Sequence, residues 1–160
     1  MTSKAPLGLT RSFLLLPPLL LGLQAGCTSR PPPDSALQRL QGTWEGVAVG
    51  GKPGEKVTIR ISGDSFHFHR DSDFWFKTRI ALPPGTEPQQ MLATILDSAS
   101  AGDTVGQVIG AIVKIEDGTL IVATKGGDGP SGQTPKGFDV TQEAGLTRFD
   151  LRKVPRPSAK

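Results

Sequence analysis

Short runs of alternating apolar and polar residues, separated by turns, constrain the fold of this chain more than any other feature. In residues 56–62, Val57, Ile59 and Ile61 fall on one face of a strand, because successive side chains of a β-strand point to opposite sides. The same period recurs further along the chain, where an Asp-Gly dipeptide joins two runs and is a strong hairpin signal. The pattern predicts an antiparallel sheet, either closed as a barrel or folded as a sandwich.

The turns divide this part of the chain into a series of expected elements. Strands are expected at residues 43–49, 56–62, 65–69, 74–82, 105–116, 119–124 and 147–154. Residues 91–96 fit either a strand or a helical turn. A short helix is expected before the first strand, beginning at Ser35, which has capping-box spacing to Gln38, and ending at Gly42.

The first 26 residues have the features of an export signal. Lys4 and Arg11 give a positive start, and no acidic residue precedes Cys27. The apolar run at residues 12–23 is shorter than the roughly 20 residues that span a bilayer as a helix, and it fits the core of a signal peptide instead.

Cys27 is the only cysteine of the chain and the expected attachment site. Residues 23–27, Leu-Gln-Ala-Gly-Cys, resemble the lipobox of bacterial lipoproteins, in which the cysteine is acylated and becomes the new N-terminus. Gln24 departs from the pattern, which prefers leucine there. Acylation, with palmitate as an expected chain, removes an oxidisable thiol and supplies the several acyl chains that stable anchoring requires. The alternative is ordinary signal cleavage and a secreted protein with a free thiol.

These features divide the chain into four parts. We expect a signal peptide at residues 1–26, a lipidated cysteine with a proline-rich tether at 27–33, a domain at 34–154 and a tail at 155–160. The expected location is the periplasmic face of the cell envelope, anchored to a lipid bilayer, with the outer membrane favoured over the inner. Secretion is expected if the lipobox is not used.

Net charge gives no reason to expect a nucleic-acid partner. The chain has 18 Lys+Arg and 15 Asp+Glu; loss of Lys4 and Arg11 leaves 16 against 15, a net charge of +1. The remaining part has no basic stripe interleaved with aromatic residues, which nucleic-acid binding would require. No cofactor is expected either.

Several short motifs occur in a characteristic order along the domain. They are LQGTW at residues 40–44, FHF at 66–68, GAIVKI at 110–115 and FDLRK at 149–153. This order resembles an uncharacterised lipocalin-like domain family that is abundant in Planctomycetes and related bacteria. The resemblance extends over about residues 34–154, with departures in the middle (91–104) and in the Gly/Pro-rich loop (126–137). It implies an all-β fold, an antiparallel up-and-down β-barrel of about eight strands with a short N-terminal helix, and no established activity.

Gly42 and Trp44 also match the glycine-x-tryptophan motif at the first strand of lipocalins. In those proteins the tryptophan plugs the closed end of the barrel, and an arginine of the last strand stacks on it through a cation–π contact. The resemblance implies this packing for Trp44, with Arg148 and Arg152 as the candidate arginines.

Two histidines are the candidate metal ligands. On a strand, His67 and His69 share a face, and Asp71 or Asp73 would supply a third ligand. The alternative is that the phenylalanines beside them form the buried face, so that the histidines are exposed and the aspartates belong to a turn. The chain has no other histidine to complete a site.

No catalytic motif supports an enzyme. The glycine-rich residues 125–132 do not end in Gly-Lys-Ser/Thr and precede no helix pattern, so they are not a phosphate-binding loop. Ser131 lies outside any Gly-x-Ser-x-Gly turn. We therefore expect a domain without catalytic activity.

Two functions remain open for the domain. A hollow barrel would bind a small apolar ligand or an envelope protein, and a continuous apolar cavity of a few hundred Å³ would favour this function. A barrel filled by its own side chains would be a structural or interaction module without a ligand. The side chains expected to fill such an interior are Val57, Ile59, Phe66, Phe76, Ile112 and Phe149.

Overall fold

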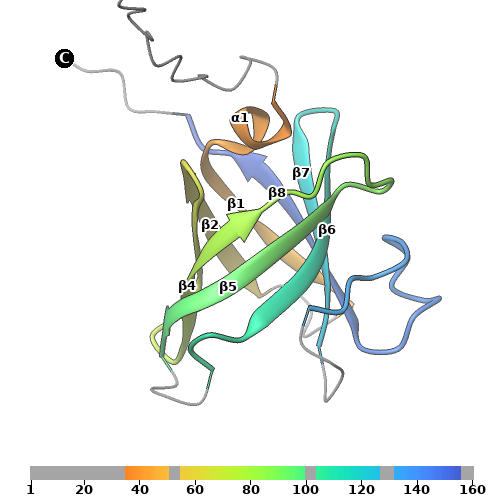
Figure 1. The fold of residues 1–160 in the computed structure, drawn as a ribbon. Coiled ribbons are helices and arrows are strands. Elements are labelled where there is room, and N and C mark those ends of the chain that lie inside the picture. The colour runs from red at the N-terminus through yellow and green to blue at the C-terminus, as the bar shows by residue number, and fades with distance from the viewer. Residues whose placement is uncertain (1–34, 51–54, 100–103, 127–131, 156–160) are drawn as a thin grey trace, which may run out of the picture. The chain divides into compact units, whose positions relative to one another are not determined.

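In a computed structural model, the domain is a closed barrel of eight antiparallel strands with a short helix at its start (Figure 1). The structure describes residues 35–50, 55–99, 104–126 and 132–155. The elements are α1 (Ala36–Leu40), β1 (Gly42–Val49), β2 (Lys56–Ser62), β3 (Ser65–Asp71), β4 (Phe74–Ala81), β5 (Gln90–Ser98), β6 (Val108–Glu116), β7 (Thr119–Lys125) and β8 (Leu146–Lys153). Each strand pairs with the next, and β8 pairs with β1. The expected up-and-down barrel is confirmed, and the sandwich alternative is wrong.

The expected signal peptide, Cys27 and the proline-rich tether lie outside the described residues. Among the residues that are described, no helix is long and apolar enough to cross a membrane.

The region for which the sequence pattern left two possibilities is a strand. In β5, Met91, Ala93 and Ile95 are buried, and the strand pairs with β4 over residues 92–98 and with β6 over residues 90–94. A helical turn at this place would leave β4 and β6 each unpaired on one side, and unpaired backbone groups in a sheet are costly. The tertiary pairing therefore decides between two local conformations that the sequence allows equally.

The helix α1 covers one end of the barrel (Figure 1). The backbone N–H of Gln38 donates to the side-chain oxygen of Ser35 at 3.3 Å, which caps the helix start as the spacing predicted. Leu40 is 3% exposed and packs with the core. The side-chain amide of Gln41 both donates to the carbonyl of Gly63 (3.0 Å) and accepts from its N–H (2.7 Å). These bonds fasten the β2–β3 turn to the helix end.

A second, smaller apolar cluster lies outside the barrel. Residues 132–145 run beside the strands rather than over the axis (Figure 1), and Phe138 and Val140 pack on Ile112, Ala123 and Leu146. Ile112 therefore faces outward, and its expected place in the interior was wrong. The reason is that both faces of this part of β6 are buried, one by the barrel and one by the loop, so the strand lacks the alternation that assigns a face.

The seam between β1 and β8 depends on a glycine. A Cβ added at Gly46 would lie 1.9 Å from the backbone oxygen of Asp150 and 2.8 Å from the Cα of Leu151. Because both obstacles are backbone atoms, no rotamer change can relieve the contact.

We predict that Gly46→Ala lowers the free energy of unfolding by about 3 kcal/mol, the upper part of the range for overpacking a core. Gly137→Ala is the matched control, since a Cβ there would meet nothing within 4 Å, and it should change stability by no more than about 0.5 kcal/mol. Urea titrations of the two purified variants give the measurement. Equal stability of the two variants would show that the seam has room for a side chain.

Candidate functional site

The interior of the barrel is hollow over the half that lies away from α1. The cavity has a volume of about 1020 Å³. It opens among the connections that follow β1, β3, β5 and β7, which are at the end opposite the helix. The described residues that line it are Ala48, Glu55, Ile59, Phe66, Phe68, Arg70, Phe74, Phe76, Met91, Ala93, Gln107, Val108, Ile109, Gly110, Ala111, Val122, Thr124, Lys125, Gly126, Gly132, Gln133, Thr147 and Phe149.

Small inward-facing residues leave this half of the barrel unfilled. Ala48 on β1, Ala93 on β5 and Ala111 on β6 all line the cavity. An eight-stranded barrel is just wide enough for large side chains to fill it, so alanine at several inward positions leaves open volume. At the other end Trp44 and Leu120 close the interior, with exposures of 2% and 0%.

Phenylalanines form most of the apolar wall. Five of the phenylalanines that the structure describes line the cavity, namely Phe66, Phe68, Phe74, Phe76 and Phe149. The rings of Phe68 and Phe76 are stacked, with centroids 4.8 Å apart and planes 5° apart. Phe149 of β8 meets Phe68 edge-on at 5.3 Å. Such contacts hold the rings in fixed orientations, so the wall is a preformed apolar surface.

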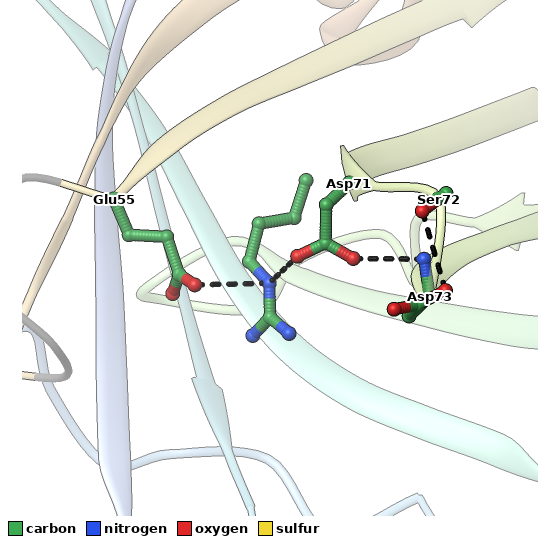
Figure 2. A network of polar contacts seen from close by, with 5 residues as sticks. Glu55, Asp71, Ser72 and Asp73 are labelled. Carbon is green, nitrogen blue, oxygen red and sulfur yellow. Dashed lines mark hydrogen bonds and ion pairs between the residues drawn. The ribbon is translucent and has the colours of Figure 1, made fainter.

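One arginine lies in the cavity wall near the mouth. The Nε of Arg70 is 3.0 Å from a carboxylate oxygen of Glu55 and 2.8 Å from one of Asp71. Figure 2 shows the carboxylates of Glu55 and Asp71 on either side of the same guanidinium, with Asp71 also accepting from the N–H of Asp73. The guanidinium carbon is 4.1 Å from the ring centre of Phe74. The hydrogen bond from Arg70, followed by the one from the Asp73 N–H, lowers the pKa of Asp71 below its usual value.

Arg70 and Glu55 were not among the residues singled out from the sequence. A signal for Arg70 was present, because it continues the every-second-residue series of Phe66 and Phe68. A charged residue at an inward-facing position of a strand points into the interior and needs a partner there. Glu55 lies in a connection, where no periodic pattern indicates direction.

The β7–β8 connection contributes to the mouth by crossing β6 at a glycine. A Cβ at Gly110 would lie 2.4 Å from the backbone oxygen of Gln133, so only glycine lets the connection approach so closely. The N–H of Gly132 donates to the carbonyl of Val108 at 2.7 Å. Gly132 and Gln133 therefore form part of the cavity rim.

Trp44 plugs the closed end, but its cationic partner differs from the one expected. Its indole N–H donates to the carbonyl of Leu40 at 2.8 Å, and the Nζ of Lys153 lies 5.2 Å from its ring centre. The expectation for Arg148 and Arg152 was wrong. In the barrel register Trp44 is opposite Lys153, and directly opposed residues share a face, so the preceding residue of β8 points outward.

Arg148 has a different role, on the outer face. It donates to Asp150 at 2.9 Å and to the carbonyl of Phe138 at 3.4 Å, which links β8 to the loop that covers the outer cluster.

The four candidate metal ligands do not gather into a site. His67 and His69 project from the outer face of β3, with ring centroids 6.5 Å apart and nearly perpendicular, while Asp71 is engaged by Arg70 and Asp73 is in the turn. Over the part of the chain that the structure describes, no three His, Cys, Asp or Glu side chains are placed to hold a metal ion. The alternative is confirmed for the buried face, since Phe66 and Phe68 are each 4% exposed. It is wrong in placing Asp71 in a turn, because this residue ends β3, and in exposing both histidines, because only His69 is exposed.

His67 is half-buried beside Trp75. Their ring centroids are 6.1 Å apart in an edge-on arrangement, which places Trp75 on the outer face and not in the cavity. Burial, followed by the charge of Lys77, lowers the pKa of His67. The buried Nε2 of His67 has no hydrogen-bond partner among the described residues, as fits a neutral imidazole.

Comparison of the chain with protein-family models, curated proteins and solved structures finds no significant match. The geometry of the barrel and its cavity is therefore the basis for the function proposed below.

The assignment of Lys153 as the partner of Trp44 can be tested by unfolding measurements. We predict that Lys153→Met lowers the free energy of unfolding by about 0.5–1 kcal/mol, the value of a cation–π contact at a solvent-accessible site. Arg152→Met is the control, because its side chain is exposed and faces away from the barrel interior, and it should have almost no effect. A larger loss from Arg152→Met than from Lys153→Met would return the arginine to the role first expected of it.

Proposed function

We propose that this protein is a lipid-anchored protein of the cell envelope whose barrel binds a small apolar ligand. The observation that carries the proposal is the cavity of about 1020 Å³ with five phenylalanines in its wall. Binding sites for small molecules are concave, mostly apolar and of roughly 300–1,000 Å³, with a few polar groups that orient the ligand. The cavity has these properties, with its charged residues Glu55, Arg70 and Lys125 all near the mouth.

The distribution of apolar surface favours binding over a purely structural role. A structural module gains stability by filling its interior, since unfilled volume forfeits dispersion contacts. This barrel is instead filled at the Trp44 end and hollow at the other end. There the phenylalanine rings of the wall face open space and do not pack against side chains across the barrel. A ligand would recover that loss, at about 25 cal/mol for each Å² of apolar surface removed from water.

The membrane anchor is the second part of the proposal and rests on the sequence. Cys27, after Leu-Gln-Ala-Gly, is the acylation site, and the proline-rich residues that follow it are a spacer to the domain. The outer membrane is the favoured location. An anchored binding protein would hold an apolar molecule, which dissolves poorly in water, at the periplasmic side of the envelope.

Cavity binding predicts a difference between two phenylalanine substitutions on the same strand. Ala93→Phe places a ring inside the cavity, whereas Leu96→Phe places one on the barrel exterior, where Leu96 is 49% exposed. We expect Ala93→Phe to weaken binding of the uncharged fluorescent probe N-phenyl-1-naphthylamine by at least about tenfold, equivalent to about 1.4 kcal/mol. Leu96→Phe should bind the probe as the unchanged protein does.

Fluorescence titration measures both affinities, and native mass spectrometry of protein purified from its own host reveals any ligand that stays bound. Equal probe affinity of the two variants would place the probe outside the barrel and refute binding in the cavity.

Anchoring is tested separately at Cys27. We predict that Cys27→Ser moves the protein from the membrane fraction to the soluble fraction and removes the mass of the acyl chains from its N-terminus. Gln24→Leu is the matched control, because it brings the lipobox closer to its usual pattern and should keep the protein in the membrane fraction. Mass spectrometry that finds Cys27 unmodified in the mature protein would support the secreted alternative.

A further inference from the structure

Among the described residues, both cations at the cavity mouth are paired with carboxylates of the protein. Three of the described residues that line the cavity are charged, namely Glu55, Arg70 and Lys125. Asp71 contacts the guanidinium of Arg70 from outside the lining, and Glu143 lies 3.1 Å from the Nζ of Lys125. These described residues comprise two cations and three carboxylates, a net charge of −1.

Arg70 nevertheless keeps hydrogen-bond donors in the cavity wall. Arginine has five N–H donors, one on Nε and four on the two Nη groups. Both carboxylate contacts of Arg70 are made to Nε (Figure 2). Across the described residues, no hydrogen bond uses either Nη group of Arg70. The arginine is therefore neutralised in charge while its terminal donors stay available.

Free Nη donors beside two carboxylates disfavour a ligand whose polar end is negatively charged. A carboxylate bound to the Nη groups would lie close to Glu55 and Asp71, and like charges near one another disfavour binding. A neutral oxygen, such as that of an ester, amide or ketone, meets the same donors without that repulsion. Among the other polar side chains of the lining, Lys125 is paired with Glu143, and Thr124, Gln133 and Thr147 are uncharged.

The aromatic rings beside Arg70 continue from the rim into the cavity wall. Phe74 holds the guanidinium at the rim, and its own ring lies 5.9 Å from Phe68, deeper in the wall. A molecule whose oxygen is bound at Arg70 therefore has its apolar part directed along the phenylalanines toward the Trp44 end.

We infer that the ligand is an uncharged amphipathic molecule, bound with a carbonyl-type oxygen on the Nη groups of Arg70 and its hydrocarbon part against the phenylalanine wall. This inference rests on the proposed binding function and adds to it the chemical class of the ligand. It also makes Arg70 the residue that distinguishes an amphipathic ligand from a plain hydrocarbon.

Three molecules with the same chain length test the inference: methyl laurate, laurate and dodecane. Each is titrated at pH 8, where laurate is ionised, against the purified protein loaded with N-phenyl-1-naphthylamine. We expect methyl laurate to displace the probe at a concentration at least about tenfold lower than laurate. Arg70→Met should lower the affinity for methyl laurate by about tenfold and leave the affinity for dodecane unchanged. Arg60 is exposed on the outer face of β2, so Arg60→Met is the control and should change none of the three affinities.

The outcomes separate the two proposals. Failure of the probe and of all three molecules to bind would overturn the binding function itself. Binding of the probe and dodecane, with laurate equal to or tighter than methyl laurate, would overturn the inference and leave the binding function standing. Unchanged methyl laurate affinity in folded Arg70→Met would overturn it as well. If Arg70→Met does not fold, the comparison of the three molecules on the unchanged protein decides the question.

Discussion

The pairing of β8 with β1 is the constraint on which the rest of the structure depends. It gives every strand two partners, so the sheet has no open edge and its backbone hydrogen bonds are satisfied by the wall alone. Because the wall is complete, the protein does not need to fill every part of its interior to stay folded. The close approach of backbone at Gly46 shows how tightly this seam is made. A hollow interior is possible because closure and filling are separate sources of stability.

The interior divides along the barrel axis into a half that is filled by side chains and a half that is hollow. At the α1 end, large side chains such as Trp44, Leu120 and Leu151 are almost fully buried, and the helix and Gln41 complete the cover. Toward the mouth, alanines replace large residues and phenylalanines stand around open volume. Substitutions at the filled end should therefore act on stability, and substitutions at the hollow end on the proposed binding.

Much of this fold follows from alternation in the sequence. The bounds of β2, Lys56–Ser62, are those expected, because polar and apolar residues alternate there without exception. Alternation also indicates that Lys153 faces the barrel interior, since Phe149 and Leu151 face inward and the next residue on that side is 153. The resemblance to lipocalins implied an arginine as the partner of Trp44 instead. Ile112 could not be assigned to a face, because apolar residues occupy both sides of β6. The cavity could not be predicted either, since it depends on how the volumes of side chains from several strands add up around one axis.

An even number of antiparallel strands has a consequence for how the domain can be joined to anything else. The chain enters β1 and leaves β8 at the same end of the barrel, next to α1, and the cavity opens at the other end. Whatever precedes Ser35 or follows Pro155 is thus attached to the plugged end. In the proposed function, the anchored segment therefore joins the domain at the end opposite the ligand entrance, so a change in the length or chemistry of either terminal segment would alter anchoring without altering the entrance.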